Sequence, residues 1–270
     1  MNKKEYESVC FTMHLKEGIL WPISIVLDVP EILIKQIKVG EKIALRDPEG
    51  VLIAALDVDD IWKPDKLLEA KTVCGTTSKE HPGVAYLIDK THPWYIGGHI
   101  EAVQLPEHYD FLSLRLGPAE LRASFTRLGW RKVIAFQTRN PMHRAQYEII
   151  LNAAKEVEVN LLLHPVVGLT KPGDVDHYTR VRCYQALLGY YPKNMVMLSL
   201  LSLAMRFAGP REALLHAIIN KNFGCTHLID EGESAECESN STGLDCSSIQ
   251  KVQEFLSKYK NELEVKILVA

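Results

Sequence analysis

VIAFQTRNPMHRAQ, residues 133–146, joins a short apolar run to a region of helical spacing. Its first four residues, Val133–Phe136, are apolar and short, which predicts a buried β-strand. A polar turn follows, and helical spacing then runs from about Pro141 to Glu156, since proline is tolerated in the first turn of a helix. The stretch therefore predicts a strand that leads directly into a helix.

The same plan repeats on the C-terminal side of this stretch. Further strands are expected at Asn160–Val167, Asn194–Leu198 and Thr226–Ile229, and further helices at Val175–Gly189 and Pro210–Asn220. Alternating strands and helices are typical of a parallel sheet with right-handed crossovers, here a Rossmann-like α/β domain. In such sheets ligands bind at the carboxyl ends of the strands.

The N-terminal half has a different pattern. From Leu20 to about Leu105 it reads as short strands, at Leu20–Val29, Lys42–Arg46 and Val51–Leu56. The turn Asp47–Gly50 is expected to join the last two as a hairpin, and we expect this half to be mostly β. Gly117-Pro118 interrupts the chain, and the helix Pro118–Leu128 is expected to bridge two domains, residues 1–116 and 117–270.

Length and composition indicate a folded protein. The chain has 270 residues, 47% hydrophobic and 24% charged, with a formal net charge of −3. This balance argues against a protein built to coat nucleic acid or an anionic membrane. No apolar run approaches the roughly 18 residues of a membrane span, and no secretory signal opens the chain. We therefore expect a cytoplasmic protein with no nucleic acid or membrane partner.

The six cysteines include no CxxC pair, which favours free thiols over a disulfide framework. Cys225, Cys237 and Cys246 cluster loosely with His227, but their spacing fits no common zinc pattern. We expect no metal held by protein side chains alone.

Charge is unevenly distributed along the chain. Between Leu121 and Tyr147 there are six basic residues and no acidic one, and between Leu228 and Gln250 there are six acidic residues and no basic one. An anionic ligand is expected beside the basic segment. Arg139 offers a planar fork that can hold a tetrahedral oxyanion with two hydrogen bonds. His143 and Gln146 are expected on one face of the first helical turn, whose N–H groups also favour an anion.

Residues 137–146 resemble a signature of the ATP sulfurylase family, Gln-x-Arg-Asn-Pro-x-His-x-x-His, with Gln146 in place of the last histidine. Later signatures of that family look similar to His164–His177, Ala204–Leu214 and Asn222–His227. Tyr6–Val9 and Leu20–Ile23 are similar to the family's N-terminal domain. The resemblance implies a β-rich, PUA-like N-terminal domain followed by a parallel-sheet nucleotidylyltransferase domain.

The resemblance also implies a reaction. The family joins sulfate to the α-phosphate of ATP and releases adenosine 5′-phosphosulfate and pyrophosphate. Sulfate is already ionised at neutral pH, so this chemistry needs no general base, and catalysis rests on positioning and charge neutralisation. Mg²⁺ is expected to arrive with ATP, no tightly bound cofactor is expected, and the family is usually homo-oligomeric.

Site residues carry over from the family's motif position by position. Gln137 and Arg139 are expected to hold sulfate, Asn140 the α-phosphate and His143 the departing phosphates. Arg139, Asn140 and His143 are thus the candidate catalytic residues. Gln137, Asn140, His143 and Gln146 are the candidate nucleotide-binding residues.

The chain departs from the family after Ile229. Where the family usually reads Val-Gly-Arg-Asp-His-Ala-Gly-Pro-Gly, residues 230–238 read DEGESAECE and keep only Ala235, whose backbone N–H the resemblance assigns to sulfate. The change places carboxylates beside a site for polyanions, which is unfavourable at short range. Both ends of the chain are expected to be shorter than in the family, and the family's usual C-terminal segment is not expected here.

Two other functions stay open. One is a degenerate paralogue that binds nucleotide or a partner subunit without turnover. The other is an RNA-binding module built on the PUA-like half, although residues 1–116 lack the basic, aromatic-lined face that this needs.

Some matched residues have structural explanations. Asp176 suits a helix N-cap and Pro210 a first-turn proline. The apolar stripe that follows the third strand is expected to pack in the core: Leu198, Leu200, Leu201, Leu203 and Met205. Lys171 and Arg211 are equally consistent with surface cations and with residues that screen phosphate charge.

Overall fold

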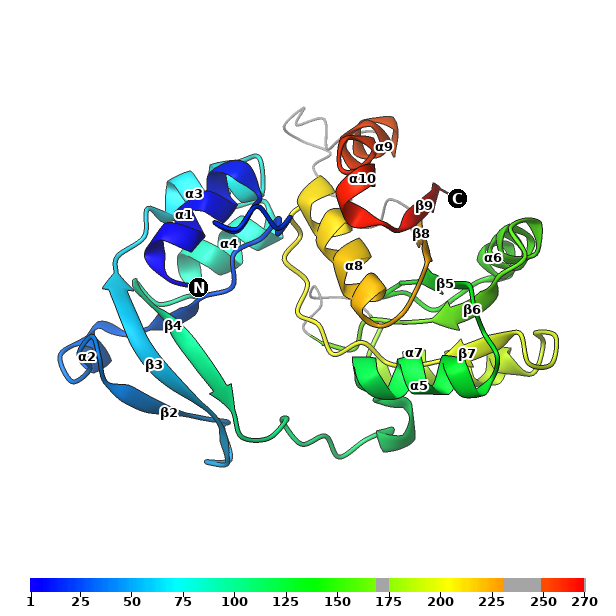
Figure 1. Ribbon diagram of the computed structural model, residues 1–270, viewed down its shortest axis with the longest axis horizontal. Helices are drawn as coiled ribbons and strands as arrows, with labels where there is room; N and C mark the ends of the chain where they lie inside the picture. The colour runs from blue at the N-terminus through cyan, green and yellow to red at the C-terminus, as the bar shows by residue number, and fades with distance from the viewer. Residues whose placement is uncertain (169–174, 231–248, 270) are drawn as a thin grey trace. The chain divides into compact units, whose positions relative to one another are not determined.

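The computed structural model describes residues 1–168, 175–230 and 249–269. The described chain divides into two compact units, Met1–Asp110 and the residues from Phe111 onward. Figure 1 shows the elements of both units in chain order. The helix that begins at Pro118 lies within the second unit.

The first unit contains a four-stranded antiparallel sheet in the order β1-β4-β3-β2. Its strands are β1 (Leu27–Val29), β2 (Lys42–Arg46), β3 (Leu52–Trp62) and β4 (Trp94–Ala102). The predicted hairpin is confirmed, because β2 pairs with β3 and the Asp47 carboxylate accepts hydrogen bonds from the backbone of Glu49 and Val51. The predicted strand Leu20–Val29 is too long. Pro22 has no N–H to give to a ladder, and only the last three residues pair with β4.

Helices make up more of the first unit than the description "mostly β" allows. They are α1 (Lys3–Thr12), α2 (Glu31–Ile34), α3 (Lys66–Val73) and α4 (Pro82–Asp89). Asn2 caps α1 and Asp65 caps α3, so both starts have local N-cap signals. Figure 1 shows α1, α3 and α4 grouped together.

A carboxylate on α3 links this helix to α1 and to the sheet. Glu69 on α3 accepts hydrogen bonds from the hydroxyls of Tyr6 on α1 (2.9 Å) and Tyr95 on β4 (3.0 Å). Both rings pack edge-on or tilted against each other and against Trp62. Burial, followed by the charge of Glu69, raises the pKa of both phenols, which therefore stay neutral donors.

The second unit contains a parallel sheet in the order β7-β6-β5-β8-β9. Its strands are β5 (Val133–Phe136), β6 (Asn160–Leu163), β7 (Val196–Leu198), β8 (His227–Asp230) and β9 (Lys266–Val269). Every pairing is parallel, which confirms the predicted α/β plan and adds β9.

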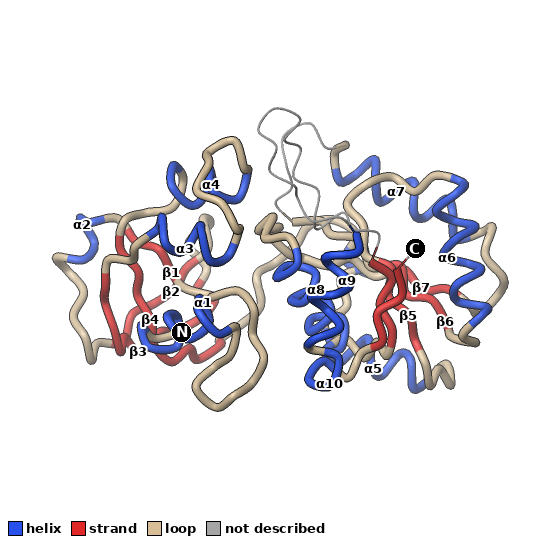
Figure 2. The backbone as a smooth tube through the Cα atoms, turned by 90° about the horizontal axis from the view of Figure 1, so that it is seen from above, coloured by secondary structure: helices blue, strands red, loops and turns tan. Residues whose placement is uncertain are grey.

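Helices cover both faces of this sheet, as Figure 2 shows. The described helices of the unit are α5 (Pro118–Arg127), α6 (Arg144–Glu156), α7 (His177–Leu188), α8 (Pro210–Asn222), α9 (Ile249–Lys258) and α10 (Lys260–Leu263), with a 3-10 turn η1 (Leu112–Leu114). The main core forms between the strands and α6 and α7, and Ile134, Phe136, Leu161 and Ile150 in it are fully buried. All four residues of β5 are buried, as expected for a strand covered on both faces.

Candidate active site

The candidate site begins where β5 ends. From β5 the sheet extends through β6 to β7, and the chain then returns to place β8 on the other side of β5. The strand order therefore reverses between β5 and β8, and open α/β sheets bind ligands at the carboxyl ends of strands at such a point. The segment Gln137–His143 leaves β5 there.

Two side chains of helix α7 hold this segment by donating hydrogen bonds to its backbone carbonyl oxygens. The buried Arg180 donates from Nη1 to the carbonyl oxygens of Arg139 (2.6 Å) and Val166 (3.0 Å). The Tyr184 hydroxyl donates to the carbonyl oxygen of Asn140. Thr138 adds a local turn, because its hydroxyl accepts from the N–H of Asn140 at 3.1 Å. Helix α7 thus fixes the backbone carbonyls of two consecutive residues, Arg139 and Asn140.

The Arg139 side chain is almost fully buried, at 3% exposure. Its guanidinium carbon lies 5.7 Å from the ring centroid of Phe207, a cation–π distance. Phe207 has a left-handed backbone (φ 57°), an uncommon conformation for a large side chain. Arg139 is therefore held in a defined place rather than solvated.

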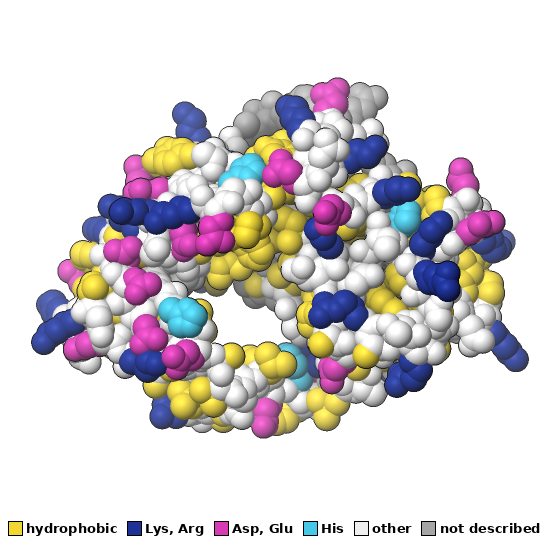
Figure 3. Space-filling view, in the orientation of Figure 1, with side chains coloured by type: hydrophobic (Ala, Val, Ile, Leu, Met, Phe, Trp, Pro, Cys, Tyr) yellow, Lys and Arg dark blue, Asp and Glu magenta, His cyan; other side chains and the backbone are white. Residues whose placement is uncertain are grey.

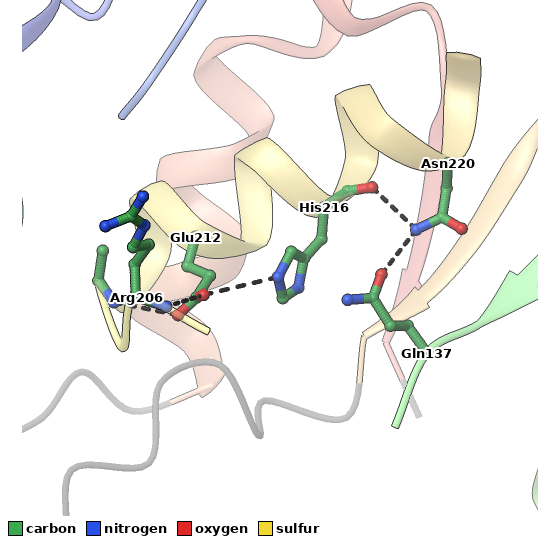
Figure 4. A network of polar contacts seen from close by, with 6 residues as sticks. Gln137, Arg206, Glu212, His216 and Asn220 are labelled. Carbon is green, nitrogen blue, oxygen red and sulfur yellow. Dashed lines mark hydrogen bonds and ion pairs between the residues drawn. The ribbon is translucent and has the colours of Figure 1, made fainter. Parts of the chain in front are cut away.

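Glu212 on α8 stabilises the backbone around Phe207. Its carboxylate accepts from the N–H of Arg206 at 2.7 Å, as Figure 4 shows. It also accepts from the N–H of Ala208 at 3.1 Å, so the two donors lie on either side of Phe207 in the chain. The His216 Nε2 lies 3.6 Å from the same carboxylate, longer than a well-formed hydrogen bond. Burial alone would raise the pKa of Glu212, but His216 and the two backbone donors bring it below its ordinary value.

A second polar chain reaches Gln137 from α8. Asn220 donates from Nδ2 to Gln137 Oε1 (2.7 Å) and to the carbonyl oxygen of His216 (2.9 Å), as Figure 4 shows. Its Oδ1 lies 2.8 Å from His164 Nδ1. Asn220 and His164 are both 0% exposed. Burial lowers the pKa of His164 to about 4, only partly opposed by the hydrogen bond to Asn220, so this imidazole is neutral at pH 7.

The neutral state of His164 predicts a pH dependence of stability. Its pKa is lower in the folded protein than the ordinary 6.5, so the unfolded chain binds more protons between these two values. Stability is then full above pH 6.5 and falls as pH drops toward 4, by about 3 kcal/mol. Urea unfolding at pH 7 and pH 4 measures the loss.

His164→Gln is the control for this prediction, because a glutamine keeps a donor to Asn220 and does not titrate. Burial also lowers the pKa of His227, so part of the loss is shared by both proteins. The variant should lose about 3 kcal/mol less than the parent over the same range. Equal losses in the two proteins would show that His164 is not the group responsible.

Helix α6 begins later than the sequence predicts. It starts at Arg144, and His143 is its N-cap with extended backbone, so Pro141 lies outside the helix. His143 Nδ1 accepts from the N–H of Gln146 (3.4 Å), and Gln146 Oε1 accepts from the N–H of His143 (3.2 Å). This reciprocal capping box outweighs the proline as a start signal. The prediction that His143 projects from the first helical turn is wrong, and the N–H of Gln146 is engaged in the cap.

The structure brings most of the predicted site residues into one segment. Gln137, Arg139 and Asn140 follow β5 directly, and His143 and Gln146 follow at the start of α6. Ala235 and Lys171 lie outside the described residues. Arg211 lies in the first turn of α8.

The structural explanations given to other residues are confirmed. Asp176 caps α7 by accepting from the N–H of Thr179, and Pro210 is in the first turn of α8. The apolar stripe packs in the core, with Leu203 partly buried and the others buried: Leu198, Leu200, Leu201 and Met205.

The residues that support the segment were not found from the sequence. Glu212, His216 and Asn220 follow one another at intervals of four along α8, which is otherwise largely apolar and buried. A polar stripe on a buried helix needs buried partners, so this spacing is a signal that could have been used. Arg180 gives no such signal, because a helical arginine is usually exposed.

In the described residues, no group of three or more His, Cys, Asp or Glu side chains could hold a metal ion. Cys225 is a buried free thiol whose pKa burial raises to about 12. Cys237 and Cys246 of the weighed zinc cluster lie outside the described residues. None of the helices in the described ranges is long and apolar enough to cross a membrane. Figure 3 shows acidic and basic side chains interspersed over the visible face of the first unit, rather than a basic surface.

Comparison with known proteins agrees with this architecture. A family model described as ATP-sulfurylase matches residues 112–270, and one described as a PUA-like domain matches residues 1–105. The sulfate adenylyltransferase of Aspergillus fumigatus is 49% identical over 271 residues, which cover 99% of this chain and 47% of that protein. The sulfate adenylyltransferase of Saccharomyces cerevisiae is 47% identical over 268 residues, covering 99% of this chain and 52% of that protein.

A solved structure shows the same fold. The structure titled hexameric APS kinase from Thiobacillus denitrificans superposes with a TM-score of 0.77 at 33% identity, over 100% of this chain and 45% of that one. The chain thus spans about half the length of the relatives it matches. A PUA-like unit followed by a parallel-sheet unit that carries the Gln137–His143 segment places the chain in the ATP-sulfurylase family.

Proposed function

We propose that this chain acts as a sulfate adenylyltransferase, which converts ATP and sulfate to adenosine 5′-phosphosulfate and pyrophosphate for sulfate assimilation. The observation that carries the proposal is the buried Arg139, in the segment that leaves β5 where the strand order reverses. Similarity to curated sulfate adenylyltransferases over 99% of the chain supports it.

The proposed chemistry is an in-line displacement. An oxygen of sulfate attacks the α-phosphorus of ATP, the bond from that phosphorus to the bridging oxygen breaks, and pyrophosphate leaves with the electron pair. Gln137, Arg139 and the backbone of Ala235 hold sulfate, and Asn140 holds the α-phosphate. His143 and Gln146 contact the phosphates that leave. Because sulfate is already an anion, these residues act by orientation and charge neutralisation and no base is needed.

The site's rigidity fits this role. A displacement of this kind depends on the alignment of attacking and leaving groups, and small misplacements are costly. Arg180 and Tyr184 fix the backbone of Arg139 and Asn140, and Phe207 packs on the Arg139 guanidinium. The protein therefore holds the two anion-binding residues in place before substrate arrives.

Mg²⁺ is proposed to enter with ATP. The Gln137–His143 segment offers nitrogen donors for phosphate oxygens, and Mg²⁺ in nucleotide sites is held largely by phosphate oxygens and water. When bound, the ion would neutralise charge on the departing phosphates. We propose no tightly bound cofactor.

The proposed partners are ATP, sulfate, adenosine 5′-phosphosulfate and pyrophosphate, with no nucleic acid or membrane. The matching structure is titled hexameric, and we propose a homo-oligomer for this chain and a cytoplasmic location. Size-exclusion chromatography with light scattering tests the oligomer.

The test of activity is the reverse reaction. Purified protein is mixed with adenosine 5′-phosphosulfate, pyrophosphate and Mg²⁺, and ATP is read as light from luciferase. We expect light that depends on all three components. Folded protein that gives none would contradict the proposal.

A degenerate, nucleotide-binding paralogue is the second candidate. It is favoured by the six acidic residues between Leu228 and Gln250, in the region that the family uses beside its polyanion site. Calorimetry with adenosine 5′-phosphosulfate separates the two. Binding without light supports the paralogue, and light excludes it.

A further inference from the structure

We infer that Asn220 is a positioning residue that sets which end of the Gln137 amide faces the substrate anion, so that Gln137 can only donate a hydrogen bond to it. The inference rests on the proposed role of Gln137 in holding sulfate.

The His216 carbonyl fixes the orientation of Asn220. A carbonyl oxygen only accepts hydrogen bonds, so the Asn220 atom that lies 2.9 Å from it must be the amide nitrogen. The amide oxygen of Asn220 then faces His164 Nδ1 at 2.8 Å. Since an oxygen cannot donate, His164 carries its proton on Nδ1. Its burial keeps the ring neutral, so this is a single tautomer.

The same nitrogen of Asn220 fixes the orientation of Gln137. Its second hydrogen points to a Gln137 atom at 2.7 Å, which must therefore be the oxygen. The Gln137 Nε2 is left on the other side, turned away from Asn220 as Figure 4 shows. This nitrogen is buried and makes no hydrogen bond within the described part of the chain.

An unused, buried N–H₂ group is costly unless a ligand accepts from it. Sulfate offers only acceptor oxygens at neutral pH, whereas hydrogen phosphate also carries an O–H that needs an acceptor. With its oxygen turned toward Asn220, Gln137 presents its N–H₂ donors to the anion, as Arg139 presents only donors. The chain from His216 through Asn220 to Gln137 thus favours a fully ionised oxyanion over a protonated one.

The first test concerns the tautomer and does not depend on activity. Ring ¹⁵N chemical shifts of His164, assigned by comparison with His164→Gln, distinguish the two neutral forms. We expect the Nδ1–H form. The Nε2–H form would overturn the orientation whatever the protein does with sulfate.

The second test concerns the substrate anion, using Asn220→Asp. An aspartate at this position accepts from Gln137 Nε2 and turns the Gln137 oxygen toward the anion. We expect sulfate affinity, measured by calorimetry and as KM, to fall about 10- to 100-fold, the range for one hydrogen bond to a charged group. The KM for ATP should change much less, and the ratio of sulfate to phosphate affinity should fall.

Matched variants keep this test decisive. Asn222→Asp introduces the same charge at an exposed position of the same helix and should leave the affinity for sulfate unchanged. Asn220→Ala imposes neither orientation and should give a smaller loss, which serves if the aspartate variant does not fold.

Gln137→Ala distinguishes a failure of the orientation inference from a failure of the proposed sulfate site. If it lowers sulfate affinity while both Asn220 variants retain it, the orientation inference is wrong and the proposed sulfate site stands. If Gln137→Ala itself retains full sulfate affinity, the role proposed for Gln137 fails.

Discussion

Replacing Arg139 with alanine is expected to lower kcat/KM for sulfate by about 1000-fold, the largest catalytic effect at this site. Arg139 is 3% exposed and its guanidinium packs on Phe207, so its removal takes a fixed, planar donor away from the anion. The measurement is steady-state kinetics with sulfate varied, in parallel with thermal unfolding to show that the variant is folded.

Two further variants define what Arg139 contributes. Arg139→Lys keeps the charge and loses the planar fork, and we expect it to recover only part of the activity. Arg131→Ala removes an exposed arginine that precedes β5, at the opposite end of that strand from the site. Its kcat/KM for sulfate should equal that of the parent protein. An Arg139→Ala protein with parental kinetics would remove Arg139 from the sulfate site.

Replacing Arg180 with methionine is expected to cost about 3–5 kcal/mol of unfolding free energy, the largest effect on stability. One nitrogen of this 2% exposed side chain satisfies the carbonyl oxygens of Arg139 and Val166. Methionine fills much of the space but leaves both buried acceptors without that donor. Urea unfolding followed by circular dichroism measures the change.

Arg182→Met is the matched control, because Arg182 lies two residues further along α7 and is exposed. It should change stability by no more than about 0.5 kcal/mol. Equal effects in the two variants would mean that the contacts of Arg180 with the segment contribute nothing specific. If the Arg180 variant remains folded at low temperature, its KM for sulfate should also rise, because the backbone of Arg139 is no longer fixed.

The second unit could be predicted from the sequence because its signals are local and agree with one another. The apolar run Val133–Phe136 and the strands at Asn160 and Val196 are short and bounded by turn residues, and helices of ordinary length lie between them. Fully buried parallel strands need no alternation, so their apolar composition alone identifies them.

The predicted start of α6 is wrong because two local signals compete there. Pro141 permits a helix start, but the His143 and Gln146 side chains form a reciprocal cap three residues later. In the first unit, the alternating strand pattern did not predict α1 and α3, although their N-cap residues, Asn2 and Asp65, are present in the sequence.

The contacts that hold the Gln137–His143 segment in place could not be predicted from local sequence patterns. The contacts of Asn220 with Gln137 and of Arg180 with Arg139 join residues far apart in the chain. Sequence patterns identify the face of a helix that is buried, but they do not identify the strand end that it meets.

In the proposed reaction, sulfate itself attacks the α-phosphate of ATP at the Gln137–His143 segment. Its most direct test is the exchange of radiolabelled pyrophosphate into ATP, measured with and without sulfate in the presence of Mg²⁺. We predict exchange that requires sulfate and disappears in the Arg139→Ala variant. Exchange without sulfate would instead indicate an adenylylated protein. The absence of exchange with sulfate present would rule out the proposed reaction.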